Sequence, residues 1–218
     1  MPDTVVARTP ITAADPVERD GWQISARRST ADLTLTDESA RAKVLVRGPF
    51  GGALRDIVGA RFGRAVRTEQ AGHPVLAVGS GPGEWLVIGP PATARPLREH
   101  LEHAAQATGE FVSVLDLTHG RALIRLRGRR SAEVLAKICG IDLHHDSTPA
   151  GAALRTSVAG LATDLIRDDD PDTPTPSYLL HCERSSGQYL FDVLLDAGAE
   201  YGIDVTGPEH GHSPLPRS

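Results

Sequence analysis

An internal repeat constrains the fold of this chain more than any single motif does. Residues 41–48 read Arg-Ala-Lys-Val-Leu-Val-Arg-Gly and residues 121–128 read Arg-Ala-Leu-Ile-Arg-Leu-Arg-Gly, a separation of 80 residues. A short helical pattern follows each glycine, at 50–58 and at 131–138. A repeat of this length is too long for a solenoid and indicates duplication of one unit that mixes strands and helices.

The two halves continue in the same order after these segments. Strand patterns follow at 74–78, 84–88, 154–166 and 178–182. Apolar residues at helical spacing close each half, at 94–107 and at 187–201, where we expect Tyr189, Leu190, Val193 and Leu194 to face inward. The predicted fold class is therefore α+β, with two tandem strand-helix-strand-strand-helix units.

The repeat also predicts how the chain is divided. Residues 30–110 form the first α+β unit and residues 111–205 the second. Residues 1–29 mix acids with prolines and are expected to be extended or partly disordered, and 206–218 is a disordered tail rich in glycine and proline. The run of aspartates and prolines between Ile166 and Tyr178 predicts an exposed hairpin loop.

Composition excludes several classes of function. The formal net charge of -5 gives no reason to expect binding to nucleic acid or to an anionic membrane. Cys139 and Cys182 lie far apart in apolar stretches, which is typical of buried thiols in a reducing compartment. We see no secretory signal and no apolar stretch of membrane-spanning length, so we expect a cytoplasmic protein.

A glycine-rich run from Gly79 to Glu84 superficially imitates a dinucleotide-binding loop. That motif needs a glycine at its sixth position and a helix directly after it. Here Glu84 occupies the sixth position, and Trp85-Leu86-Val87-Ile88 is a strand pattern. We interpret the run as a tight β-hairpin turn.

Two clusters of polar residues are candidates for chemical sites. His144 and His145 precede Asp146, but adjacent residues in an extended segment point to opposite sides, so a solvated turn is favoured over a metal site. His210 and His212 lie in the tail, without a scaffold to hold a ligand geometry.

The second cluster combines a carboxylate, a hydroxyl and an imidazole in Asp116, Thr118 and His119. In a strand the first two would share one face while His119 points away, so a polar connection between strands is favoured. We therefore expect no catalytic, cofactor-binding or metal-binding residue in this chain.

Several strings in order along the chain resemble the gamma subunit of heterotetrameric sarcosine oxidase. They are Gly-Pro-Gly-Glu-Trp-Leu-Val-Ile at 81–88, Val-Ser-Val-Leu-Asp-Leu-Thr-His-Gly-Arg-Ala at 112–122, Cys-Gly-Ile-Asp-Leu at 139–143, Gly-Ala-Ala-Leu-Arg-Thr at 151–156, and Glu-Arg-Ser through to the tyrosine at 183–189. The resemblance spans about residues 30 to 203. The chain departs from the family pattern at Gly83, where the family usually has aspartate, and in the acidic loop at 168–177.

The resemblance implies a ferredoxin-like or folate-binding aminomethyltransferase-type fold. It implies a non-catalytic subunit that packs against a large alpha subunit, in a complex completed by beta and small delta subunits. Such a complex acts on a CH–NH bond, oxidises sarcosine to glycine with oxygen and passes the one-carbon unit to tetrahydrofolate. FAD, FMN, NAD and tetrahydrofolate are then expected in the partner subunits. Expected interface or structural residues of this chain are Glu84, Trp85, Asp116, Arg121 and Asp142.

Two other functions stay open on the sequence alone. The first is a stand-alone folate-binding or aminomethyltransferase-like protein, in which Asp116 or Asp142 would be the carboxylate beside the pterin. The second is a general interaction module for some other complex.

Overall fold

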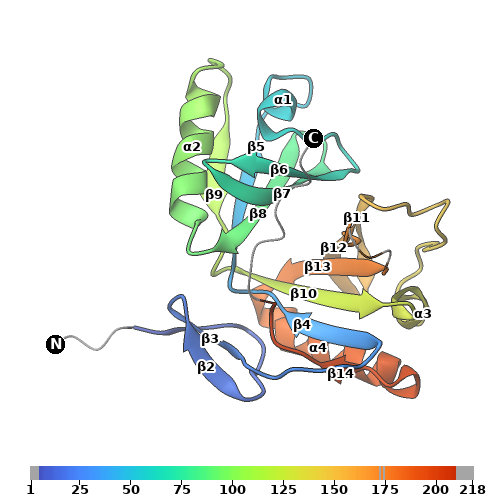
Figure 1. Cartoon of the computed structure of the whole chain (residues 1–218). Helices are drawn as coiled ribbons and strands as arrows, with labels where there is room; N and C mark the ends of the chain where they lie inside the picture. Colours follow the sequence, from blue (N-terminus) through green and yellow to red (C-terminus); the bar gives the residue numbers. More distant parts are fainter. Residues whose placement is uncertain (1–4, 172, 174, 210–218) are drawn as a thin grey trace. The chain divides into compact units, whose positions relative to one another are not determined.

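The structure, a computed structural model, describes residues 5–171, 173 and 175–209 and divides them into two compact units. Unit 1 contains the described residues up to Ala40 together with 119–209, and unit 2 contains residues 41–118. Each unit combines a sheet with helices (Figure 1), which confirms the α+β class. In the part of the chain that the structure describes, no helix has the length and apolar character needed to cross a membrane.

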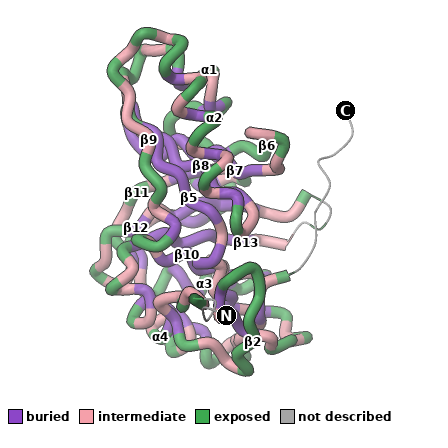
Figure 2. The backbone as a smooth tube through the Cα atoms, turned by 90° about the vertical axis from the view of Figure 1, so that its left-hand side faces the viewer, coloured by how far each residue is buried: buried purple, intermediate pink, exposed green. Residues whose placement is uncertain are grey.

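Unit 2 is built on a five-stranded antiparallel sheet in the order β6-β7-β8-β5-β9. Its elements are β5 (Arg41–Arg47), α1 (Leu54–Val58), β6 (Ala65–Gln70), β7 (His73–Gly81), β8 (Glu84–Pro91), α2 (Ala94–Gln106) and β9 (Ser113–Asp116). Alternate residues of β5, such as Val44 and Val46, pack with Leu97 and Leu101 of α2 in one apolar core. The central strands are accordingly the most buried part of the unit (Figure 2).

Unit 1 repeats this plan around a six-stranded sheet in the order β11-β12-β13-β10-β4-β14. Its elements are β4 (Leu33–Asp37), β10 (Arg121–Gly128), α3 (Ser131–Ala136), β11 (Ala153–Val158), β12 (Leu161–Arg167), β13 (Ser177–Glu183), α4 (Gly187–Gly198) and β14 (Asp204–Val205), with 3₁₀ turns at Arg184–Ser186 and Ala199–Tyr201. Leu190 and Leu194 of α4 are buried against this sheet. Tyr189 points outward with 53% of its surface exposed, so the inward orientation expected for it was wrong.

The first strand of each expected segment, 30–110 and 111–205, belongs to the sheet of the other segment. Strand β4 precedes β5 in the chain but pairs with β10, where Leu35 lies opposite Leu126. Strand β9 precedes β10 but pairs with β5, where Leu115 lies opposite Leu45. The units of the structure therefore differ from the expected segments 30–110 and 111–205. The repeated strands β5 and β10 each pair with one further strand, β9 and β4 respectively, and the repeat in the sequence does not specify which of the two pairs with which.

The N-terminal segment is more ordered than expected. Strands β1 (Ala7–Arg8), β2 (Pro16–Arg19) and β3 (Trp22–Ser25) form a small sheet. The Trp22 ring lies in an apolar cluster with Ile24 and Ala40 and stacks on the His119 ring at a centroid distance of 4.5 Å. The expectation of partial disorder over 1–29 was therefore wrong for the described residues from 5 onward, because Trp22 provides a core for this sheet.

The predicted tail is ordered at its beginning. The Thr206 amide donates to the Leu35 carbonyl oxygen at 3.0 Å, and the Gly207 amide donates to the Arg27 carbonyl oxygen at 2.7 Å. These bonds hold the start of 206–218 against unit 1. The rest of the predicted tail, residues 210–218 with His210 and His212, lies outside the described residues.

The acidic hairpin loop joins β12 to β13 as predicted, but its first aspartates are not freely exposed. Asp168 is 6% exposed. Successive acids pair with different arginines: Asp168 with Arg125 at 2.9 Å, Asp169 with Arg167 at 3.1 Å, and Asp170 with Arg127 at 3.4 Å. The expectation of a simply exposed loop was wrong here because these pairs satisfy the carboxylates at the edge of the sheet.

A second, partly buried carboxylate links strands β11, β12 and β13. Asp164 accepts a hydrogen bond from Arg155 at 2.7 Å and lies 2.9 Å from His181 Nδ1. Burial opposes ionisation of Asp164, but the hydrogen bonds and charges of His181 and Arg155 outweigh it and hold its pKa below the usual 3.8. The stabilisation is therefore present above that usual value and is lost as the pH falls through the lower folded-state pKa.

Replacement of this aspartate by Asp164→Asn should flatten the acid limb of the stability curve. We expect the variant to lose about 1–3 kcal/mol of unfolding free energy at neutral pH and progressively less below about pH 4. Urea unfolding at a series of pH values measures both effects. Parallel curves for the two proteins would show that Asp164 contributes nothing to acid sensitivity.

Candidate interaction surface

Three of the four phenylalanines of the chain are exposed, and all three belong to unit 2. Phe50, Phe62 and Phe111 expose 60%, 55% and 95% of their surfaces, whereas Phe191 is buried in unit 1. Large aromatic side chains that gather in solvent are unusual for a monomer and mark interaction surfaces. We call Phe50, Phe62 and Phe111 the aromatic end of unit 2.

Strand pairing places these three residues at the same end of the sheet. Arg47, the last residue of β5, pairs with Glu84 at the start of β8 and with Ser113 at the start of β9. Phe50 follows Arg47 by three residues, and Phe111 precedes Ser113 by two. Phe62 forms a bridge to Gly79 near the end of β7, which reaches the same end of the sheet.

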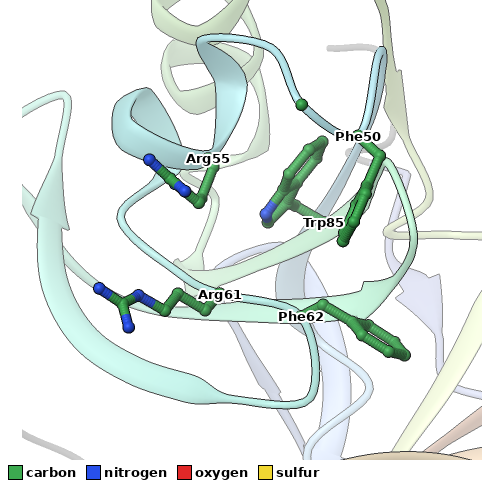
Figure 3. Close-up of a pocket in the computed structure, with 6 residues that line it drawn as sticks. Phe50, Arg55, Arg61, Phe62 and Trp85 are labelled. Atoms are coloured by element: carbon green, nitrogen blue, oxygen red, sulfur yellow. The ribbon is translucent and has the colours of Figure 1, made fainter.

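An open pocket of about 410 Å³ lies within the aromatic end (Figure 3). Its lining residues are Phe50, Gly51, Arg55, Arg61, Phe62 and Trp85. Trp85 is 2% exposed, and its indole N–H donates to the Ala60 carbonyl oxygen at 2.9 Å, which fixes the ring. The Phe50 and Phe62 rings meet edge to face, with centroids 6.4 Å apart. The pocket therefore has a fixed indole and a paired aromatic wall.

The glycine-rich hairpin turn holds both walls of this pocket in place. Gly83 has a φ of 69°, and a Cβ at this position would lie 2.3 Å from the Gly48 carbonyl oxygen, just before Phe50. A Cβ on Gly79 would lie 2.2 Å from the Arg61 carbonyl oxygen. The run from Gly79 to Glu84 thus contains the predicted hairpin turn, at Pro82 and Gly83 between β7 and β8. Its glycines allow two segments that carry phenylalanines to approach closely.

The segment that carries the pocket is strongly basic. Between residues 47 and 67 the sequence has five arginines and one acid, Asp56. Arg47 pairs with Glu84 at 2.8 Å, and Arg55 pairs with Asp56 at 2.9 Å. The hydrogen bond and charge of Arg55 lower the pKa of the exposed Asp56 carboxyl, and Arg61 adds to this effect. Arg61 is exposed and forms no ion pair with any residue that the structure describes.

The residues expected at an interface fall into separate places. Glu84 and Trp85 lie together at the aromatic end. Asp116 ends β9 and accepts a hydrogen bond from the Thr118 amide at 2.8 Å. In unit 1, Arg121 pairs with Glu183 at 2.6 Å, and Asp142 accepts hydrogen bonds from the His144 amide and the Ser147 hydroxyl. The last three residues therefore have local structural bonds.

The phenylalanines and Arg61 were not identified from the sequence. The available signal was the position of Phe50 and Phe62 directly before glycines, since segments of this kind seldom provide core positions. Aromatic residues are buried in most proteins, so their identity alone favours a core assignment.

The remaining chemical candidates have ordinary environments. Burial raises the pKa of the Cys182 thiol to about 11, so this group is protonated at neutral pH. His144 and His145 are exposed beside Asp146, in the predicted solvated turn. Across the described residues, no three histidine, cysteine, aspartate or glutamate side chains gather as a metal site would require.

Comparison with known proteins assigns the fold first. The glycine cleavage system aminomethyltransferase T of Bartonella henselae superposes with a TM-score of 0.70 over 92% of this chain and 59% of that chain, at 15% identity. The heterotetrameric sarcosine oxidase of Corynebacterium sp. U-96, in complex with pyrrole 2-carboxylate, has a chain that superposes with a TM-score of 0.64 at 26% identity, over 81% of this chain and 89% of that one. The chain therefore has an α+β fold similar to that of this aminomethyltransferase, and it carries an exposed aromatic pocket. Residues 47–200 match the model of the sarcosine oxidase gamma subunit family, and the chain belongs to that family.

A curated relative adds a link to the same fold group. A probable aminomethyltransferase of Aeropyrum pernix is 28% identical over 148 residues, which are 62% of this chain. The matched part is 39% of that relative, so the chain spans about two fifths of its length. Membership of the gamma subunit family confirms the resemblance identified from the sequence.

Proposed function

We propose that this chain is the gamma subunit of a heterotetrameric sarcosine oxidase and that the aromatic end of unit 2 docks onto the alpha subunit. The observation that supports this docking surface is that Phe50, Phe62 and Phe111 are all exposed at one end of one sheet. Aromatic residues and arginines are the side chains most enriched in the centres of protein interfaces. This surface combines both.

The proposal includes a division of labour within the complex. The oxidation of sarcosine at its CH–NH bond with oxygen, and the binding of FAD, FMN, NAD and tetrahydrofolate, belong to the partner subunits. This chain contributes no catalytic residue and acts in the cytoplasm by stabilising the assembly. Family membership and the sarcosine oxidase structure support this function. The high pKa of the Cys182 thiol is consistent with it.

Substitution of the two most accessible aromatic residues tests the docking surface. Phe50→Ser with Phe111→Ser should reduce recovery of the chain with co-expressed alpha, beta and delta subunits at least tenfold, since buried aromatic anchors carry much of the binding energy of an interface. Quantitative co-purification through a tag on the alpha subunit measures the effect. Tyr189→Ser is the matched control, because Tyr189 is similarly exposed but lies on unit 1.

The outcomes of this experiment distinguish the gamma-subunit function from the proposed docking surface. Failure of the unmodified chain to join the partners would contradict the gamma-subunit function. Full recovery of the double variant, with the unmodified chain also recovered, would contradict the docking surface and leave the function intact. A folded double variant is expected, because both side chains already face solvent.

A further inference from the structure

We propose that the pocket formed by Phe50, Phe62, Trp85, Arg55 and Arg61 receives an apolar side chain of the alpha subunit that lies next to a carboxylate. This inference rests on the proposed function and specifies the chemistry of the partner at the docking surface. It predicts a short acidic segment with an aromatic or large aliphatic residue at its centre.

The shape and lining of the pocket suit one large apolar side chain of the partner. The volume of about 410 Å³ lies at the lower end of the range of ligand pockets and is ample for one large side chain. Trp85 is fixed through its indole N–H and lines the pocket with an apolar ring. Phe50 and Phe62 lie on backbone segments that pass close to the hairpin, which is possible because Gly79 and Gly83 have no side chains. The pocket is therefore preformed, and little ordering entropy opposes binding.

The distribution of side chains around Trp85 suits a carboxylate of the partner beside that apolar side chain. In Figure 3 the guanidinium groups of Arg55 and Arg61 lie on one side of Trp85 in the view, while Phe50 and Phe62 lie on the other. Arg55 is already paired with Asp56 at 2.9 Å, whereas Arg61 adds only a smaller electrostatic effect on Asp56 and forms no ion pair with any described residue. A guanidinium binds a carboxylate through two parallel hydrogen bonds, so Arg61 is suited to a carboxylate that arrives beside an apolar side chain.

The charge of the rest of the chain makes this basic pocket distinctive. Residues 41–118 contain nine basic and seven acidic residues, a formal charge of +2, within a chain whose total is -5. The remaining residues therefore carry -7. An acidic partner segment is attracted to the five-arginine stretch, while the net negative charge of the remaining residues disfavours its approach elsewhere, which orients the encounter.

Competition inside one complex tests the carboxylate contact. Unmodified chain and Arg61→Glu, carrying different tags, are co-expressed with the alpha, beta and delta subunits, and the ratio incorporated is measured by quantitative mass spectrometry. We expect the charge-reversed chain to be incorporated about tenfold less, Arg61→Gln to be intermediate and Arg61→Lys to recover partly. Arg95→Glu, an exposed arginine on α2, should compete equally with the unmodified chain.

Equal incorporation of the Arg61→Glu chain would overturn the proposal, and absence of both chains from the complex would instead contradict the gamma-subunit function.

A cross-link identifies the occupant directly. A photoreactive benzoylphenylalanine at position 62 should attach to an alpha-subunit peptide with an aspartate or glutamate within about two residues of a large apolar side chain. Attachment to a peptide without a carboxylate, or to another copy of this chain, would also overturn the proposal. Thermal unfolding of each variant confirms that it is folded before the ratios are compared.

Discussion

Replacement of Arg125 by methionine should lower the free energy of unfolding by about 3–5 kcal/mol. Arg125 lies on β10 with its guanidinium between two carboxylates, 2.5 Å from Glu38 and 2.9 Å from Asp168. Its Nη1 also donates to the Ser177 hydroxyl at 2.7 Å. Although burial opposes the charged form, the two carboxylates raise the pKa of Arg125 above its usual value. Removal of the guanidinium leaves both carboxylates without this cation in a site where only 12% of the Glu38 side chain and 4% of the Asp168 side chain are exposed.

Chemical denaturation of the purified chain measures this loss. The control is Arg127→Met two residues along the same strand, where the partners Asp170 and Glu209 are 34% and 85% exposed. Pairs exposed to this extent are worth about 1 kcal/mol or less, so the control should change stability little. Equal losses for the two variants would contradict a special role for the buried cluster.

A combined variant separates the cost of unpaired charge from the value of the cluster. Arg125→Met together with Glu38→Gln and Asp168→Asn removes all three charges at once. Because the penalty of the single substitution comes mainly from leaving two largely buried carboxylates without the Arg125 guanidinium, we expect the triple variant to regain a large part of the lost stability. A triple variant less stable than Arg125→Met would show that the ion cluster itself is strongly stabilising.

The sequence predicted elements whose signals are local. The strands that end at Gly48 and Gly128, and the helices after them, follow from apolar periodicity and glycine termination, and the structure contains them. The exchange of β4 and β9 between the two sheets was not predicted. That pairing is decided by contacts between residues far apart in the chain, such as Leu35 with Leu126, and no local pattern reports them.

Three hairpins show where the local signal was present and where it was weak. Asp20-Gly21 between β2 and β3 has positive φ at both residues and is a strong type I′ turn signal, so this hairpin was predictable. Ala71-Gly72 and Ala159-Gly160 make the corresponding turns in units 2 and 1. Alanine is uncommon at positive φ, so the strand β6 before Ala71 was missed.

The same limit applies to the candidate site. The run from Gly79 to Glu84 was correctly assigned as a hairpin, with a strand rather than a helix directly after it. Its role in shaping a pocket was not predicted, because that role depends on which segments pass over the glycines. Segment 61–64 crosses Gly79 in the folded chain, and this contact joins residues that no periodic pattern connects.

Introduction of a single methyl group at Gly79 should disturb both stability and the pocket. The Cβ of Gly79→Ala would lie 2.2 Å from the Arg61 carbonyl oxygen and 2.9 Å from the Phe62 Cα, both of them backbone atoms that cannot rotate away. Segment 61–64 must therefore move, which strains its hydrogen bonds between Gly63 and Gly79 and between Gly79 and Arg64, each 2.9 Å long. We expect a loss of about 2–3 kcal/mol, typical of overpacking.

The pocket provides a second measurement of this change. The chain has two tryptophans, so in a Trp22→Phe background the fluorescence reports on Trp85 alone. Displacement of segment 61–64 pulls Ala60 away from the indole N–H of Trp85 and admits water, so the emission should shift to the red and recovery with the alpha subunit should fall. Gly140→Ala is the control, because no atom lies within 4 Å of its added Cβ, and surface changes of this kind stay within about 0.5 kcal/mol. Unchanged emission with full recovery of the complex would show that Gly79 does not shape the docking surface, whereas lost stability with normal recovery would separate the fold from the pocket.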